Sequence, residues 1–445
     1  MPSLAEIKYE DLDQLHKAAN DEYLARSMAI GKRQEYYNGN HKKWLIDPLT
    51  KKPTSQNVTV NVTQKIVDQS VSMLFGGDLV IKTGNDALDA VVEAMEDYNF
   101  DEAFYTSLAA SGSIGGHCYV KIMQDESGIR WVMLNPSLVS VFWSPSDLRD
   151  VIAYKIQWSE GATEYRQDII KDGATWIMRD LQREKSGQWK ITNDQVWEYE
   201  FAPIVDWQNL PNFTGYYGKS DLTALELNDA INFVSSNINA ILYYHAHPRT
   251  IGTGVRADQV KQTAVNGFYA IENNDAKVYN LEMESDLSSS QSYLAFLRNE
   301  FFSQQRAVDI QSVKDKVGQL TNFGLRVLFS DAIQKNATKQ ILYGYGIKEL
   351  IYRSLVIAGA NVEARNINVE FVDPMPVNDL ENANRIKTQI ESGITSRQTG
   401  AEEMGYDWIT EASRMASERA EQSASIGNAL MDAIRATDAA ELENA

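Results

Sequence analysis

The sequence lacks several features that mark whole classes of protein. It holds a single cysteine, Cys118, so no disulfide can form within the chain, which fits a reducing compartment. No apolar run approaches the roughly 18 residues of a membrane-spanning helix, and the acidic first residues lack the basic and apolar regions of a secretory signal. Lysine and arginine number 42 against 61 acidic residues, a formal net charge of −19. We therefore expect neither a secreted nor a membrane protein, and not one that coats nucleic acid electrostatically.

One segment of the sequence matches part of a nucleotide-binding motif but lacks an essential glycine. Gly218-Lys219-Ser220 matches the end of a phosphate-binding loop, but the glycine required five residues earlier is replaced by Phe213, whose side chain would obstruct the backbone cradle. We instead interpret this segment as the start of a helix, with Ser220 near the N-cap and Asp221 complementing the helix dipole.

Motifs for metal binding and catalysis are also missing. His245 and His247 lie two residues apart, whereas ligands on one helix face need a spacing of four. The glycines of 112–116 precede a predicted strand, which favours a tight turn over a dinucleotide site, because that site needs its glycines between a strand and the following helix. No nucleophile-elbow or kinase motif occurs. The sequence predicts no catalytic residue, no metal and no cofactor.

The first half of the chain combines helices with a β-rich region. With 445 residues, 43% of them hydrophobic, we expect roughly two to four folded domains. Apolar residues at helical spacing predict helices over about 10–38, 62–75 and 86–110, with a short strand at 79–81. From about 118 to 205 the pattern changes to the period of two that is typical of strands. The strands are expected at 118–123, 131–134, 140–143, 151–156, 175–178 and 196–201.

A long amphipathic helix follows the loop that ends at Ser220. Five apolar residues recur at steps of four and three, which predicts a helix of about 25 residues, roughly 38 Å long. The opposite face is polar, and we expect it to meet water. The apolar stripe consists of Leu227, Ile231, Val234, Ile238 and Ile241, and the polar face of Asn228, Asn232, Ser235, Ser236 and Asn239.

The second half of the chain repeats long helices around short interruptions. A compact α/β insert is predicted over 249–290, with strand-like segments at 268–271 and 277–281. A second long helix starts near Gln291, with Leu294, Leu297 and Phe301 on one face. We expect a break at 311–324, a third helical stretch over about 325–358, a strand at 366–372 and helices over 378–445.

Four segments of the chain stand out as motifs: 33–41 (RQEYYNGNH), 61–76, 116–121 (GHCYVK) and 218–222 (GKSDL). Each motif is weak alone, but their order combined with the helix, insert, helix, loop, helix pattern is specific. In these motifs and in this order of elements, the chain resembles the portal proteins, or head-to-tail connectors, of tailed double-stranded DNA bacteriophages. The sequence departs from the family at Gly77-Asp78, where a proline often stands.

This resemblance implies an α+β fold, mainly helical, with long stem helices, a β-rich wing, a small α/β clip insert and a helical C-terminal crown. It also implies a function without catalysis, as a conduit for DNA packaging and ejection. The expected parts are the wing at 1–218 and 325–375, the stem helices at 219–247 and 291–310, the clip at 248–290, the tunnel loop at 311–324 and the crown at 376–445.

By the same resemblance, two parts of the chain would meet partners. The tunnel loop would face the axis of a ring, where Lys314 and Lys316 form a local positive belt, with Gln319 and Asn322 beside them, while the large negative net charge keeps DNA sliding. The clip strands are too short to form a sheet alone, so we expect them to pair across subunits and to dock partners. The clip residues singled out are Phe268, Tyr269, Ile271, Val278 and Tyr279.

The implied assembly is a ring, usually of twelve subunits, at one vertex of the virion capsid, formed in the cytoplasm of the host bacterium. Its implied partners are double-stranded DNA, the terminase large subunit, a neck or head-completion adaptor, and the major capsid and scaffolding proteins. Two alternatives stay open: a head or neck protein that does not conduct DNA, and a nucleotide-driven packaging ATPase, which only Gly218-Lys219-Ser220 favours.

Overall fold

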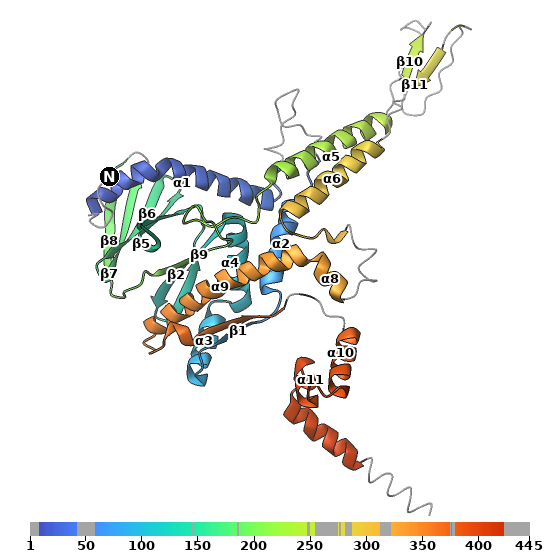
Figure 1. Ribbon diagram of the computed structural model, residues 1–445. Helices are drawn as coiled ribbons and strands as arrows, with labels where there is room; N and C mark the ends of the chain where they lie inside the picture. The colour runs from blue at the N-terminus through green and yellow to red at the C-terminus, as the bar shows by residue number, and fades with distance from the viewer. Residues whose placement is uncertain are drawn as a thin grey trace, which may run out of the picture. The chain divides into compact units, whose positions relative to one another are not determined.

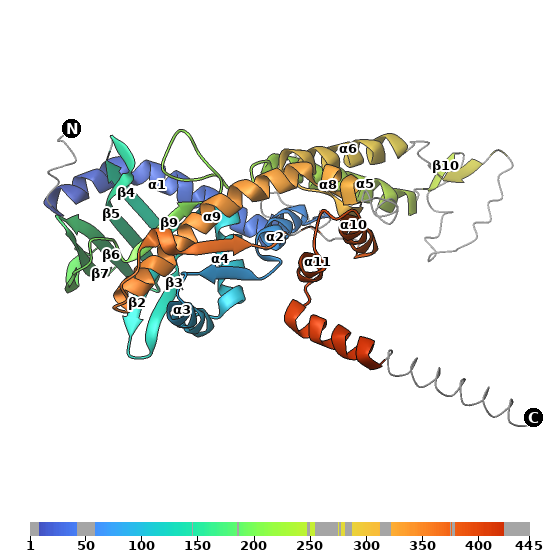
Figure 2. The ribbon, with the colours of Figure 1, turned by 60° about the horizontal axis from the view of Figure 1, so that its bottom comes forward.

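The computed structural model describes residues 9–41, 58–144, 146–184, 187–246, 250–253, 275, 277–280, 287–311, 322–373, 375 and 379–421. The chain divides into two compact units. The first comprises residues 1–318 and 326–374, and the second comprises residues 319–325 and 375–445. The structure mixes helices with antiparallel sheets, as the sequence predicts (Figures 1 and 2).

The helices at the start of the chain are α1 (Tyr9–Tyr37), α2 (Val62–Phe75), α3 (Asp86–Tyr98) and α4 (Asp101–Gly115). The first two confirm the predicted helices. The third predicted stretch is two helices, separated where Phe100 takes a left-handed conformation with φ 65°. The tight turn expected over 112–116 is wrong. α4 continues through Gly115 and ends at Gly116, whose φ of 88° suits glycine at a helix C-cap.

The β-rich region forms two antiparallel sheets, of five strands in the order β4-β5-β6-β7-β8 and of three strands in the order β3-β2-β9. The sequence analysis did not predict two of these strands. The strand expected at 196–201 is the end of β8, which finishes at Trp197. β6 carries few apolar residues, and it buries the ion pair of Arg166 and Asp168, so an apolar pattern cannot reveal it. The bounds are β2 His117–Asp125, β3 Gly128–Met133, β4 Val139–Ser144, β5 Asp147–Glu160, β6 Thr163–Asp172, β7 Thr175–Glu184, β8 Lys190–Trp197 and β9 Ile204–Gln208, of which β6 and β9 were missed.

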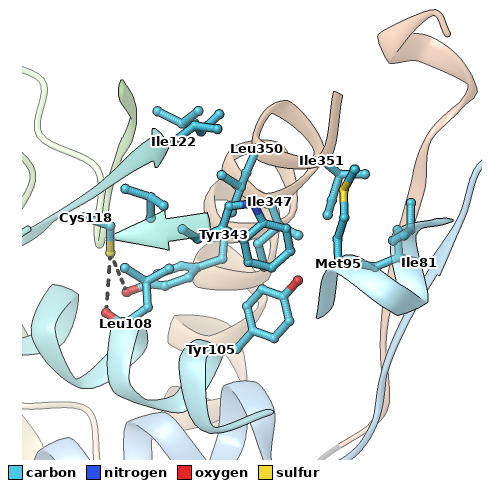
Figure 3. Close-up of a cluster of buried hydrophobic side chains, with 14 of the residues drawn as sticks. Ile81, Met95, Tyr105, Leu108, Cys118, Ile122, Tyr343, Ile347, Leu350 and Ile351 are labelled. Carbon is cyan, nitrogen blue, oxygen red and sulfur yellow. Dashed lines mark hydrogen bonds between the residues drawn. The ribbon is translucent and has the colours of Figure 1, made fainter. Parts of the chain in front are cut away.

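The largest apolar core lies around α9 (Ser330–Ile357), which the sequence predicted as one stretch with the short helix α8 (Asn322–Leu328). Its Tyr343, Ile347 and Leu350 pack against β2 and α4 (Figure 3). Two short strands, β1 (Leu79–Lys82) and β12 (Asn368–Phe371), pair antiparallel and confirm the strands expected near 79–81 and 366–372. This pairing places residues 368–371, near the end of the first unit, beside residues 79–82.

The single cysteine belongs to this core. Its thiol lies 3.3 Å from the Tyr343 hydroxyl, to which it donates (Figure 3). Burial raises the pKa of Cys118 to about 12, so the thiol stays protonated and unreactive at neutral pH. Gly112 of α4 is required here, because a Cβ at this position would collide with the Tyr343 hydroxyl and the Cys118 sulfur.

Two helices pack side by side as a hairpin, α5 (Leu225–Ala246) and α6 (Ser288–Gln304) (Figures 1 and 2). The chain between them carries β10 (Thr250–Thr253) and β11 (Lys277–Asn280), which pair antiparallel. The second unit is helical, with α10 (Asp379–Glu391), α11 (Arg397–Glu403) and a helix over 408–421. Gly400 of α11 packs against Ile386 and Ile390 of α10.

Candidate functional site: the helical hairpin and its base

The apolar stripe of α5 packs on α6, as its spacing predicts. Ile231 is buried, and Leu227 and Val234 are half-buried against the same cluster. The opposing residues are Leu294, Leu297 and Phe301 of α6, the face singled out from the sequence. Ile238 and Ile241, nearer the other end of α5, are only half-buried. The hairpin is therefore best packed at its base, where it meets the rest of the unit.

The expectation that the polar face of α5 meets water is wrong at the base. Asn228 and Asn232 have exposed fractions of 0%. Asn232 Oδ1 accepts a hydrogen bond from the Val60 backbone N–H at 2.7 Å, and Ser236 Oγ accepts one from the Val58 N–H at 2.9 Å. The extended segment before α2 thus lies across this face. Its backbone needs polar partners when buried, and the amide and hydroxyl side chains supply them.

A histidine completes this polar junction. His41 Nε2 lies 2.8 Å from the Tyr36 carbonyl and donates to it, so Nδ1 accepts from the Asn232 amide at 3.0 Å. The His41 ring also stacks on Tyr36, with centroids 4.8 Å apart. The Tyr36 hydroxyl donates to Asp229 of α5, and its burial, together with this carboxylate, raises the pKa of Tyr36. The 33–41 segment therefore fixes α5 through its aromatic and histidine side chains.

The Gly218-Lys219-Ser220 segment is a chain crossing, not a helix start. α5 begins at Leu225, so Ser220 is not its N-cap and Asp221 does not sit in its first turn. The Ser220 hydroxyl instead donates to the Ser113 carbonyl at 2.6 Å. Gly218 and Gly116 cross so closely that a Cβ on either would collide with the other's carbonyl oxygen.

The same segment has no free cradle for a phosphate. The Gly218 N–H donates to His117 Nδ1, the Lys219 N–H to the Leu210 carbonyl, and the Asp221 N–H to the Ser113 carbonyl. A phosphate-binding loop offers such N–H groups to its ligand. Because these donors are already used within the fold, the geometry argues against nucleotide binding at this segment.

Two lysines of α9 hold the base of the hairpin, and the sequence analysis missed both. Lys339 has an exposed fraction of 0%, and its ammonium donates to Ser70, Ser113 and Asp221 at 2.8–2.9 Å. Lys335 donates to the Gln305 carbonyl at 2.8 Å, just past the end of α6. One helix therefore binds both the chain leading into α5 and the end of α6. Their spacing could have indicated their burial, because Lys335, Lys339 and the buried Tyr343 follow one another at steps of four and so lie on the same face of the helix.

The charges in this cluster are unequal, with two ammonium groups to one carboxylate. Burial acts to raise the pKa of Asp221, but the ammonium groups of Lys339 and Lys335 outweigh it and hold that pKa well below its usual range. Burial lowers the pKa of Lys335 more than its attraction to Asp221, 3.8 Å away, raises it. The end of α6, with its partial negative charge, provides the remaining acceptor.

A comparison with models of protein families shows which family the chain belongs to. The family model described as "Phage portal protein, SPP1 Gp6-like" matches residues 16–425. The chain belongs to this family of phage portal proteins. Portal proteins are structural, without an enzymatic activity of their own. The resemblance read from the sequence motifs is thereby confirmed.

Solved structures give similar chains at low sequence identity. A chain from the virion of a native gene transfer agent particle is 13% identical, with 84% of this chain and 94% of that chain covered, at a TM-score of 0.48. A chain from the neck of an empty gene transfer agent particle, computed with C6 symmetry, is 14% identical over 78% and 90% of the two chains, at a TM-score of 0.47. No curated protein sequence matches this portal protein.

The portal residues expected to contact DNA fall largely outside the described residues. Lys314, Lys316 and Gln319 lie there, and Asn322 is the first residue of α8. Of the clip residues, Phe268, Tyr269 and Ile271 also lie outside the described residues.

One of the predicted clip strands has a partner in its own chain. Val278 and Tyr279 belong to β11, which pairs with Gly252 and Ile251 of β10 in the same chain. The strand expected at 277–281 thus has a partner within its own subunit. The partner, β10, was not expected as a strand, because only Ile251 in it is strongly apolar.

Within the described part of the chain, no three histidine, cysteine or acidic side chains converge as a metal site would require. No described helix combines the length and the apolar character needed to cross a bilayer.

Proposed function

We propose that this portal protein forms a closed ring of twelve subunits at one vertex of a phage-like virion, and that double-stranded DNA passes through the ring during packaging and ejection. The supporting observation is the surface of the hairpin away from its base. α6 exposes Tyr293 and Phe296, whose rings stack on each other, and α5 exposes Leu242. Large apolar side chains on both helices of one hairpin suit a lateral contact in which α5 of one subunit meets α6 of the next.

The parts of the chain receive roles by family membership and by position. We assign the wing to 1–218 and 325–375, the stem to α5 and α6, the clip to the segment between them, the tunnel loop to 311–324 and the crown to 376–445. The clip is proposed to dock the terminase large subunit and later the neck adaptor, and the wing to meet the capsid and scaffolding proteins. Assembly would take place in the cytoplasm of the host bacterium.

The ring is tested with the full-length protein by native mass spectrometry and electron microscopy. Wild-type protein should give rings with a central hole. Replacing Tyr293→Ser and Phe296→Ser together should leave mainly monomers with an unchanged circular dichroism spectrum. The matched control is Ile191→Ser with Val196→Ser, which removes two comparably exposed apolar side chains from β8. Only monomers from the wild type, across a range of salt and protein concentration, would refute the ring.

The passage of DNA is tested at the tunnel loop. Lys314 and Lys316 are proposed to give weak, salt-screened phosphate contacts in a ring that otherwise carries a large negative charge. Lys314→Glu with Lys316→Glu should leave rings intact and reduce packaging or retention of DNA. Packaging at the normal rate and yield by this variant, at low and high salt alike, would exclude the contact.

A head or neck protein that does not conduct DNA is the second candidate. It would share the ring and the docking surfaces, so the packaging experiment separates the two. The ATPase alternative loses its support, because Gly218-Lys219-Ser220 has its backbone donors satisfied within the fold.

A further inference from the structure

A cleft of about 430 Å³ lies in the first unit, with His117 and Gly218 of the chain crossing among its lining residues. It is bounded by α1, by Trp143 of β4 and by the 212–218 loop. A volume of this size is typical of sites that bind small ligands or single side chains of a partner. The lining residues that matter are Arg26, Arg33, His117, Trp143, Tyr216 and Tyr217.

Two arginines of α1 give the cleft an uncompensated positive charge. Arg33 is partly buried, and within the described part of the chain it makes no hydrogen bond or ion pair. Burial lowers the pKa of Arg33, as expected for a cation that has lost water without gaining a counterion. Arg26 donates to the carbonyls of Pro136 and Val139, and its guanidinium lies 4.0 Å from the centroid of the Tyr217 ring. It too has no carboxylate at ion-pair distance among the described residues.

The other ionisable groups at the cleft do not neutralise these arginines. Asp206 lies behind its wall and accepts from His117, Tyr154 and Tyr216. The Gly218 N–H donates to His117 Nδ1, and His117 Nε2 donates to Asp206, so both ring nitrogens are used within the fold. Glu22 is the one acidic residue in the lining, and it is exposed and unpaired with either arginine. Among the described residues, the guanidinium of Arg33 therefore has no counterion in a cleft that is also lined by aromatic side chains.

The aromatic side chains of the cleft pack on one another. Trp143 lies parallel to Tyr216, with centroids 5.0 Å apart and planes 15° from parallel, and Tyr217 meets Trp143 edge-on. Trp143 is only half-buried, so it can cover an apolar or aromatic group. A ligand that offers both a carboxylate and an aromatic side chain would satisfy both parts of the cleft.

We propose that this cleft binds an acidic peptide segment of a partner protein, with a carboxylate on Arg33 and a neighbouring aromatic or apolar side chain on Trp143. Arginine recognises carboxylates with two parallel hydrogen bonds, which favours this chemistry. A nucleic acid is disfavoured, because two arginines beside Glu22 do not form a basic stripe along which a backbone could run and the chain carries a net charge of −19. The proposal does not depend on ring formation.

The test is saturation-transfer NMR on the full-length protein with three probes. These are acetyl-Asp-Phe-amide, its neutral counterpart acetyl-Asn-Phe-amide, and phenyl phosphate. The aspartyl probe should bind about tenfold more tightly than the asparaginyl probe, because only the former offers a charged acceptor. Arg33→Gln should abolish this difference, whereas Arg149→Gln, which removes an exposed arginine of β5, should preserve it. Trp143→Leu should weaken both peptides by a similar factor.

Four results would overturn the assignment. Equal binding of the two peptides, or an undiminished preference in Arg33→Gln, would exclude recognition of a carboxylate. Tighter binding of phenyl phosphate than of the aspartyl probe would assign the cleft to a phosphate-bearing partner instead. Absence of binding by every probe at about 10 mM, with folded protein confirmed by circular dichroism, would exclude a ligand site. Ring assembly is measured separately, so its failure stays distinguishable from these outcomes.

Discussion

The two ends of α5 show opposite relations between polarity and exposure. At the base, Asn228 and Asn232 are completely buried, although a polar helix face ordinarily meets water. At the other end, Leu242 is 51% exposed, and Tyr293 of the neighbouring α6 is 52% exposed. The same hairpin thus buries amides and exposes apolar side chains.

The difference lies in what completes each end. The base is completed within the chain, by residues 58–60, His41 and the lysines of α9, which form hydrogen bonds with buried polar groups of α5 and of the chain leading into it. Among the described residues, Asn228 Oδ1 and Gln305 Nε2 are buried there without a partner. The other end has no such covering within the described residues of the subunit. A helix of an assembled protein can therefore carry polar side chains where its own chain packs on it. It can carry exposed apolar side chains where a neighbouring subunit packs on it.

The largest effect is expected from breaking the charge cluster at the base. Lys339→Met should lower the free energy of unfolding by about 3–5 kcal/mol, because it leaves the buried Asp221 carboxylate without its main counterion. Denaturant unfolding measures this loss. Lys65→Met, on the exposed face of α2, should change stability by less than about 0.5 kcal/mol. The double variant Lys339→Met with Asp221→Asn should recover part of the loss, and no recovery would contradict the charge explanation.

Acid should weaken the same cluster. The pKa of Asp221 is lower in the folded than in the unfolded protein, so its contribution is fully present above the unfolded value of about 3.9 and is lost as the pH falls through the lower folded value. Asp221→Asn removes this contribution, on the order of 2 kcal/mol. The stability difference between wild type and Asp221→Asn should therefore shrink below about pH 4. Asp78→Asn, at an exposed position, should follow the wild-type profile; an equal profile for Asp221→Asn would contradict the assignment.

A comparison within α5 tests the burial of its amides directly. Asn232→Ala removes the partner of the Val60 N–H and of His41, and should cost about 1–3 kcal/mol. Asn239→Ala, on an exposed position of the same helix, should cost less than about 0.5 kcal/mol. Thermal and denaturant unfolding give both values. Equal costs at the two positions would show that the base does not depend on its buried polar contacts.

The smallest effect on the isolated subunit is expected at the exposed end of the hairpin. Leu242→Ser should change the stability of the dilute monomer by less than about 0.5 kcal/mol. It should weaken self-association by about tenfold per contact, because the side chain would no longer bury its apolar surface against a neighbour. Native mass spectrometry over a concentration series measures this. Unchanged assembly would remove Leu242 from the interface.

Regular apolar spacing accounts for the correct predictions. Leu227, Ile231 and Val234 indicated α5, and Leu294, Leu297 and Phe301 indicated the matching face of α6, because helix periodicity is a local property. The missed strand β6 and the misread polar face of α5 have different causes. Asn232 of α5 is buried by Val60 and His41, which are far away in sequence, and spacing within one segment carries no information about such partners. In β6, Arg166 and Asp168 pair with each other and are buried together, whereas an apolar pattern reveals only strands whose buried residues are apolar.

The sequence by itself determined that the chain is a portal protein, that two long helices form a hairpin, and which faces of those helices meet. Only the tertiary structure decided that Lys335 and Lys339 of α9 bind the base of both helices, and that Asp221 is their counterion and not a helix-start residue. It also decided that Arg33 lines a cleft without a partner among the described residues. The physical reason is that the cost of a buried charge depends on which donors and acceptors surround it. In this fold those groups come from α2, α4 and α9, more than 100 residues from Asp221 along the chain in each case.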